Sequence, residues 1–350
     1  MDIFHLFDVT IEKQASDLHL IPDYYPAIRI NNDLYFIRSA NLLTRESVEK
    51  LVISILNEEQ KENLFANKEV DLGYEYKGNR FRTNIYYSKN KLAAAFRLIG
   101  SKIKTIEELN LPDQFHQFTD VNQGMILITG PTGEGKSTSL AAIIDEINHK
   151  YSKHIITIED PIEYVYPSAK SIVSQRELHQ DTHSWNIALR SALREDPDVV
   201  LLGEMRDYET IQSALTIAET GHLVFSTLHT GSTSETINRI IDVFPANQQN
   251  QIRSQLSSVL KAVIAQRLIP SLDKTKRIPA VEILLNISSV AAVIREGRTH
   301  ILDNILETEE EQGLFLFEKY LLKLYEKSLI SKDTALTYAI RPGEMRKFLK

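Results

Sequence analysis

Residues 130–137 read Gly-Pro-Thr-Gly-Glu-Gly-Lys-Ser, which is a complete match to the G-x-x-x-x-G-K-[ST] pattern of a phosphate-binding loop. The apolar run MILIT (125–129) precedes the loop and is expected to be a strand, and a helix is expected after it. Glycines allow successive backbone N–H groups to wrap around phosphates, and the positive end of the following helix points at them. The pattern therefore predicts a nucleotide-binding strand–loop–helix unit.

The residue types in this loop predict ATP and Mg²⁺ as ligands. Lys136 is placed for the β- and γ-phosphates, and the Ser137 hydroxyl is placed for the metal. Glu134 is expected to face solvent, because a carboxylate directed inward would repel phosphate. The predicted nucleotide-binding residues of the loop are Gly130, Pro131, Thr132, Gly133, Glu134, Gly135, Lys136, Ser137 and Thr138.

The pattern of apolar and polar residues changes near residue 100, which predicts two domains. Short alternating segments before that point indicate a small α+β domain with an antiparallel sheet. From about 109, apolar runs at 125–129, 154–158, 198–202 and 223–228 alternate with helical segments, which favours a parallel sheet buried on both faces. Beyond 245 the chain is expected to be mostly helical, with one apolar stripe from Ile252 to Ile264.

Composition excludes several other classes of protein. There is no cysteine, so thiolate catalysis and Cys-based zinc sites are ruled out. The 40 basic residues are scattered among 47 acids with a net charge of -7, so direct nucleic-acid binding is not expected. Neither a signal peptide nor an apolar run long enough to cross a bilayer is present, which favours a cytoplasmic protein that reaches the membrane only through a partner.

Acidic residues follow two of the predicted strands. Glu204 comes after the run 198–202, with Gly203 where an Asp would more often stand, and is predicted to contact Mg²⁺ through a water. Glu159, Asp160 and Glu163 follow the run 154–158, at the strand end where such sheets bind ligands. We favour Glu163 as the general base for the attacking water and place Glu159 and Asp160 at the nucleotide.

Two histidines, His222 and His229, flank the predicted strand 223–228. No third ligand is near them, so a sensor of the γ-phosphate is favoured over a metal site, with a structural role as the alternative.

Three arginines of the first domain, Arg80, Arg82 and Arg97, are candidates for neutralising charge on the γ-phosphate. Surface ion pairing is the alternative for them.

Together these segments resemble the secretion-superfamily ATPases, and within that superfamily the PilT-like retraction ATPases of type IV pili. They match the order of the Walker A, Asp box, Walker B and His box of that family, and two first-domain segments match as well. The matching segments are GPTGEGKST (130–138), TIEDPIEY (157–164), REDPDVVLLGEMRD (194–207), TGHLVFSTLHT (220–230), ASDLHL (15–20) and RFRTN (80–84).

The resemblance implies a homohexameric motor with a PAS-like domain at 1–99, a linker at 100–108 and a RecA-like ATPase domain at 109–350. ATP would be held between the two domains. The implied partner is the inner-membrane platform protein, and through it pilin, which places the motor at the inner face of the cytoplasmic membrane.

Three features favour the retraction branch over its relatives. The chain begins almost directly with the ASDLHL domain, and it lacks the four-cysteine zinc motif of many assembly ATPases. The segment SVAAVIREGR (289–298) resembles the retraction ATPases, although Ala291 and Ala292 replace an expected Arg and Asn. A pilus-assembly, DNA-uptake or secretion ATPase remains an alternative, and so does a nucleotide-dependent binding switch that does not hydrolyse ATP.

Overall fold

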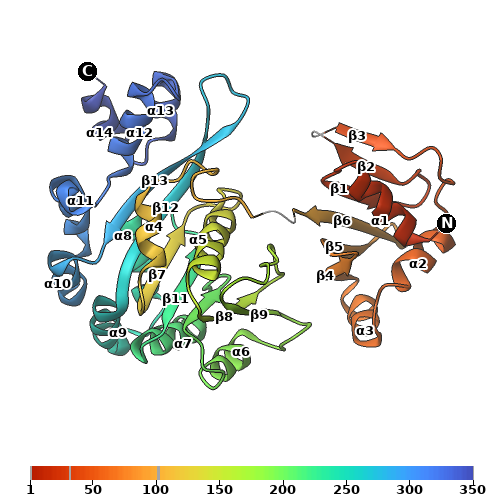
Figure 1. Ribbon diagram of the computed structural model, residues 1–350, viewed down its shortest axis with the longest axis horizontal. Helices are drawn as coiled ribbons and strands as arrows, with labels where there is room; N and C mark the ends of the chain where they lie inside the picture. Colours follow the sequence, from red (N-terminus) through yellow and green to blue (C-terminus); the bar gives the residue numbers. More distant parts are fainter. Residues whose placement is uncertain (1, 31–32, 101–102, 350) are drawn as a thin grey trace. The chain divides into compact units, whose positions relative to one another are not determined.

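The computed structural model describes residues 2–30, 33–100 and 103–349, which form two compact units (Figure 1). Unit 1 comprises Met1–Lys102 together with the short segments Asp160–Val165 and Glu177–Asp181, and unit 2 comprises the rest of the chain. Two segments from beyond residue 109 therefore group with the first hundred residues. Residues 101–102 of the predicted linker lie outside the described residues.

Unit 1 contains a six-stranded sheet in the order β3-β2-β1-β6-β5-β4, in which all neighbours are antiparallel. Its elements are α1 (Ile3–Glu12), β1 (Asp17–Leu20), β2 (Ala27–Ile30), β3 (Asp33–Phe36), α2 (Arg45–Ile53), α3 (Glu58–Asn67), β4 (Glu69–Tyr76), β5 (Asn79–Ser88) and β6 (Lys91–Ile99). The centroid of the Phe7 ring in α1 lies 4.5 Å from the ring centroid of Phe81 and 5.1 Å from that of Phe96. Aromatic contacts therefore attach this helix to the sheet.

Unit 2 contains a seven-stranded sheet in the order β13-β12-β7-β11-β10-β8-β9. The strands are β7 (Gly124–Thr129), β8 (His154–Glu159), β9 (Ile172–Glu177), β10 (Val199–Leu202), β11 (Leu223–Leu228), β12 (Leu260–Pro270) and β13 (Arg277–Leu285). Strands β12, β7, β11, β10 and β8 are parallel, and β13 is antiparallel to β12. The expected α/β fold with a buried parallel sheet is confirmed.

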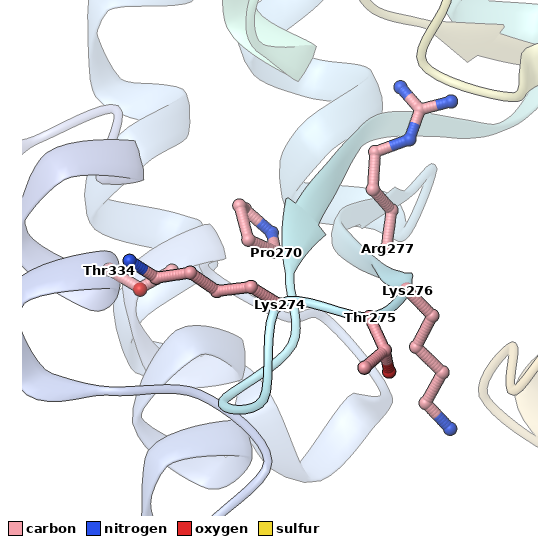
Figure 2. Close-up of a pocket in the computed structure, with 6 residues that line it drawn as sticks. All are labelled: Pro270, Lys274, Thr275, Lys276, Arg277 and Thr334. Carbon is pink, nitrogen blue, oxygen red and sulfur yellow. The ribbon is translucent and has the colours of Figure 1, made fainter. Parts of the chain in front are cut away.

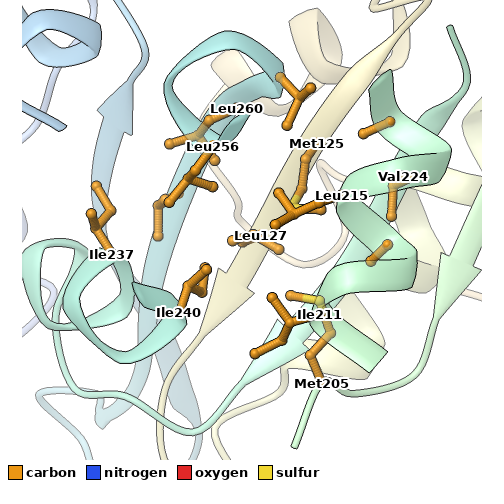
Figure 3. Close-up of a cluster of buried hydrophobic side chains, with 14 of the residues drawn as sticks. Met125, Leu127, Met205, Ile211, Leu215, Val224, Ile237, Ile240, Leu256 and Leu260 are labelled. Carbon is orange, nitrogen blue, oxygen red and sulfur yellow. The ribbon is translucent and has the colours of Figure 1, made fainter. Parts of the chain in front are cut away.

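The helices of unit 2 are α4 (Gln114–Thr119), α5 (Lys136–Lys150), α6 (Trp185–Ala192), α7 (Tyr208–Glu219), α8 (Thr233–Asp242), α9 (Ala246–Val259), α10 (Ser288–Glu296), α11 (Leu302–Thr308), α12 (Phe317–Glu326), α13 (Lys332–Tyr338) and α14 (Pro342–Phe348), with short 3₁₀ turns at Thr299–Ile301 and Glu310–Gln312. Helices α6, α7, α8 and α13 begin at a side-chain cap, as at Asp207, whose carboxylate accepts a hydrogen bond from the N–H of Thr210. Figure 3 shows side chains of α7, α8 and α9 meeting those of β7 and β11 in one apolar core.

The expectation of a mostly helical chain beyond residue 245 is wrong for residues 260–285. The apolar stripe that was predicted to be one helix divides at Leu260, where α9 ends and β12 begins. Residues Ala262 to Gln266 are all buried, because β12 lies between β7 and β13 and is covered on both faces. A strand that is buried on both faces has no polar side, so its apolar residues also satisfy a helical spacing.

No helix among the described residues is both long and apolar enough to cross a membrane.

Candidate nucleotide-binding site

The phosphate-binding loop connects β7 to α5 near the middle of the parallel sheet. Gly130 has a φ of +145°, and a Cβ atom there would lie 2.3 Å from the backbone oxygen of Gln266 on β12. A side chain is therefore excluded both by the backbone conformation and by the neighbouring strand. The loop begins in close contact with β12.

Lys136, the first residue of α5, is buried with its ammonium group inside the curve of the loop. Its Nζ donates to the carbonyl oxygens of Gly130, at 2.8 Å, and Pro131, at 2.9 Å. This contact places a positive charge beside backbone N–H groups at the N-terminal end of a helix, an arrangement that suits phosphate.

Glu134 does not face solvent as expected. It is half-buried, and its carboxylate accepts a hydrogen bond from the backbone N–H of Leu268 on β12. The physical reason is the length of β12, which extends beyond its pairing with β7 and leaves backbone donors facing the loop. The acidic side chain is thus directed toward a neighbouring strand.

Glu204 and His229 meet at the carboxyl ends of the adjacent parallel strands β10 and β11. Nε2 of His229 lies 3.1 Å from Oε2 of Glu204, and Nδ1 of the same ring lies 3.4 Å from Oγ1 of Thr132 in the loop. In the tautomer that carries its proton on Nε2, the ring donates a hydrogen bond to the carboxylate of Glu204. Its Nδ1 then accepts a hydrogen bond from the hydroxyl group of Thr132. Three residues predicted from separate motifs are therefore brought into one chain of contacts.

The electrostatic surroundings of Glu204 favour its charged form. Burial opposes ionisation of the carboxylate, but hydrogen bonds from Arg206 and His229 outweigh this effect and bring the pKa of Glu204 below its ordinary value.

The predicted Mg²⁺ ligands have suitable chemistry. Mg²⁺ prefers hard oxygen ligands and retains several waters, and the Ser137 hydroxyl and the Glu204 carboxylate supply such oxygens. Both carboxylate oxygens of Glu204 already accept hydrogen bonds, one from Arg206 and one from His229. This arrangement fits contact with a metal through a bound water better than direct coordination.

Glu159 ends β8 and is buried. Its Oε1 accepts hydrogen bonds from Oγ1 of Thr157, at 2.6 Å, and from Nε2 of Gln175, at 3.3 Å. Asp160 is exposed and Glu163 is half-buried, and both belong to unit 1. The predicted roles of these acids at the nucleotide stay predictions.

His222 lies at the opposite edge of the sheet from His229. It precedes β11, whose first residue pairs with Gly124 at the start of β7, whereas the loop follows the end of β7. The six residues of β11 lie between the two histidines, and the seven steps from one to the other span about 23 Å at about 3.3 Å per residue. His222 Nδ1 instead lies 3.1 Å from the carbonyl oxygen of Ile217. The structure therefore does not bring His222 to the loop of its own chain.

The three predicted arginines all have acidic partners within unit 1. Arg80 pairs with Glu177, Arg82 Nη2 lies 3.0 Å from Oδ2 of Asp71, and Arg97 Nε lies 2.9 Å from Oδ1 of Asp17. Delivery of these arginines to a phosphate stays a prediction.

The residues of the β12–β13 hairpin that contact the loop were not predicted from the sequence. Gln266 of β12 bonds to Ser139 and to the backbone of Glu134, and Arg277 of β13 bonds to the backbone of Gly133. A hairpin signal was present in the two apolar runs at 260–270 and 277–285, which are separated by the turn-forming segment SLDKTK.

The chain is similar to several known proteins along most of its length. The protein family described as type II/IV secretion system protein matches residues 87–344. The type IV pilus retraction ATPase PilT of Pseudomonas aeruginosa is 44% identical over 338 residues, which cover 96% of this chain and 97% of that protein. A twitching motility protein of Neisseria gonorrhoeae is 45% identical over 313 residues, covering 89% of this chain and 83% of that protein. A crystal structure of the pilus retraction motor PilT with bound ADP superimposes with a TM-score of 0.92 at 42% identity, covering 99% of each chain.

Proposed function

Because the chain belongs to the type II/IV secretion system protein family, we propose that it is a hexameric, ATP-hydrolysing motor that retracts type IV pili. The observation that carries this proposal is the chain of contacts from Thr132 of the phosphate-binding loop through His229 to Glu204. It joins the phosphate site to an ionised acid at the strand ends where P-loop NTPases position magnesium and water.

The roles predicted for the individual residues give the following chemistry. Bound ATP and Mg²⁺ supply the phosphoryl group and a divalent charge. Apart from Pro131, which has no N–H, the backbone N–H groups of residues 130–137 and the Lys136 ammonium would hold the phosphates. Ser137 would hold the metal directly, and Glu204 would hold it through a water. Glu163 accepts the proton of the attacking water, and His229 couples the state of the loop to Glu204. Arg80, Arg82 and Arg97 neutralise charge that develops on the γ-phosphate.

Similarity to proteins of pilus retraction and twitching motility supports retraction, rather than assembly, as the work of this motor. The P. aeruginosa PilT and the N. gonorrhoeae twitching motility protein match nearly all of this chain. We infer a PAS-like domain at 1–99 and a RecA-like domain at 109–350. We also infer that the ring works in the cytoplasm at the inner-membrane pilus platform and acts on pilin through that platform.

ATP hydrolysis by the purified chain tests the proposal. The wild type is compared with Glu204→Gln, and with Glu326→Gln as a control at an exposed position on α12. We expect Mg²⁺-dependent turnover by a hexamer, a loss of about 10²-fold or more in kcat for Glu204→Gln, and little change in ADP affinity. A monomer that binds ATP without turning it over would instead favour a nucleotide-dependent switch.

Whether the motor retracts or assembles pili is tested in cells. Deletion of the gene is expected to leave pili on the surface and abolish their retraction. Loss of pili altogether would favour an assembly ATPase.

A further inference from the structure

Strand β12 extends past the strand that carries the phosphate-binding loop. Its pairing with β7 ends at Ala265, opposite Thr129, whereas its pairing with β13 continues to Pro270. Leu268 lies opposite Pro279 on β13, and its backbone N–H donates to the carboxylate of Glu134. The backbone oxygen of Gln266, two residues earlier, lies against Gly130. The extended part of β12 thus presents its main chain to the loop.

The side chain of Gln266 contacts both the loop and the helix that follows it. It is almost fully buried. Its Oε1 accepts a hydrogen bond from Oγ of Ser139 in α5, at 2.8 Å, and its Nε2 donates to the carbonyl oxygen of Glu134, at 2.7 Å. A buried amide with one donor and one acceptor contact in place has a defined orientation.

Arg277, at the start of β13, reaches the loop from the other strand of the hairpin. Its Nη1 donates to the carbonyl oxygen of Gly133, at 3.3 Å. Figure 2 shows the Arg277 side chain extending away from those of Lys274 and Lys276, which point in other directions from the same turn. The three cations therefore do not converge on one anion, and only Arg277 contacts the loop.

These contacts have a consequence for the phosphate site. In a trans peptide, the C=O of one residue and the N–H of the next lie in one plane and point in opposite directions. A donor that binds the Gly133 oxygen from outside the loop therefore directs the N–H of Glu134 toward the inside of the loop. A donor that binds the Glu134 oxygen directs the N–H of Gly135 toward the inside in the same way. Phosphate-binding loops work through such inward N–H groups.

We propose that Gln266 and Arg277 are positioning residues that orient the 133–134 and 134–135 peptide planes toward the nucleotide phosphates, while the Glu134 carboxylate anchors the loop to Leu268. This inference rests on the proposed nucleotide binding. It gives the β12–β13 hairpin a direct influence on phosphate affinity, although none of its residues needs to touch the nucleotide.

The decisive variant is Gln266→Glu in the full chain, with ADP affinity measured by calorimetry. The new side chain has the same shape and keeps an acceptor for Ser139, but an ionised carboxylate cannot donate to the Glu134 oxygen. We expect ADP affinity to fall by about tenfold or more. Ser139→Ala is the matched control, because it removes the other hydrogen bond of Gln266 and leaves the donor to the loop. It is expected to change ADP affinity by less than about threefold.

The pH dependence of the variant separates positioning from a general structural defect. Burial raises the pKa of an introduced carboxyl, and its protonated form carries an O–H that can donate to the Glu134 oxygen. ADP affinity of Gln266→Glu should therefore recover toward that of the wild type as the pH is lowered from about 8 to about 5.5. Charged neighbours such as Glu134, Lys136, Arg267 and Arg277 are the same in both proteins, so their titration is common to both curves.

An exposed pair of variants gives a second test if Gln266→Glu does not fold. Arg277→Met removes the contact with Gly133, and Lys276→Met removes the same charge from the adjacent residue, which points elsewhere. We expect ADP affinity to fall by about threefold or more for Arg277→Met and to stay within about twofold for Lys276→Met. The inference would be overturned if Gln266→Glu and Arg277→Met had no effect on ADP affinity, or if each had the same effect as its control, Ser139→Ala or Lys276→Met. In either case, ADP binding by the wild type would still support the proposed function. A wild type that bound no ADP would overturn both.

Discussion

Nε2 of His229 lies 3.1 Å from Oε2 of Glu204, so a histidine at the end of β11 binds the acid that follows β10. The two strands are parallel neighbours, with Leu202 paired to Ser226, which brings their carboxyl ends to the same edge of the sheet. On its other side the ring contacts Thr132 of the phosphate-binding loop. One side chain therefore contacts both the loop and the acid.

Substitution of His229 should separate turnover from binding. His229→Ala removes a hydrogen bond from Glu204 and the contact with Thr132 but leaves the backbone of the loop intact. We expect kcat for ATP hydrolysis to fall by about tenfold or more, with ADP affinity changed by less than about threefold. Steady-state kinetics and calorimetry provide the two measurements. A loss of ADP affinity as large as the loss of kcat would contradict a coupling role.

His222→Ala should behave differently, because His222 lies at the other end of β11. Its ring bonds near the end of α7, at the Ile217 carbonyl and the Thr220 hydroxyl. We expect a loss of about 1 kcal/mol in the free energy of unfolding and unchanged ADP affinity. Urea denaturation and calorimetry on the same preparation test this, and weakened ADP binding would show that His222 acts at the nucleotide after all.

The lowered pKa of Glu204 predicts how its contribution to stability varies with pH. Hydrogen bonds from Arg206 and His229 outweigh the effect of burial, so the folded state holds the proton less tightly than the unfolded state does. The stabilisation is complete above the unfolded pKa of about 4.3 and is lost as the pH falls through the lower folded pKa. Between about pH 5 and pH 3, the Tm difference between wild type and Glu204→Gln should therefore shrink. A difference that grew over this range would contradict the sign of the shift.

A buried ion cluster connects the C-terminal helices to the sheet and should dominate their stability. Arg341 Nη1 lies 2.7 Å from Oε2 of Glu282 and 3.2 Å from Oε2 of Glu318, and both glutamate side chains are fully buried. Arg341→Met leaves these carboxylates without their cation, which should cost about 3–5 kcal/mol of unfolding free energy in chemical denaturation.

Because burial raises the pKa of Glu318, protonation of Glu318 at lower pH should reduce the cost of Arg341→Met. Arg346→Met, on the exposed side of α14, is the control and should cost less than about 0.5 kcal/mol. A cost for Arg341→Met no larger than that of the control would contradict the role of the cluster.

Gly130→Ala should disrupt the loop where it meets β12. The added Cβ would lie 2.3 Å from the Gln266 oxygen, in a backbone conformation that alanine disfavours. We expect a loss of about 1–3 kcal/mol in unfolding free energy together with loss of ADP binding. Gly100→Ala is the control, because a Cβ there meets nothing within 4 Å and stability should be unchanged. Normal ADP binding by Gly130→Ala would show that the loop can move away from β12.

Much of the ATPase unit was predictable from local pattern. The glycine spacing of residues 130–137 specifies a loop between a strand and a helix, and the apolar runs before Glu159 and Glu204 specify buried strands. The cap at Asp207 is likewise local, because its partner Thr210 is only three residues away. These features depend on residues that lie close together in the chain, so the sequence alone is enough to predict where they occur.

The contacts that shape the phosphate site depend on which strands are neighbours, and only the tertiary structure decides this. The orientation of Glu134 follows from β12 lying beside β7, although the two segments are more than a hundred residues apart in sequence. The difference between His222 and His229 follows from the direction of β11 in the sheet. Sequence determined which residues can bind phosphate and magnesium, because the chemistry belongs to the side chains and the turn. The sheet determined which of them meet, because strand order and register are set by packing between distant segments.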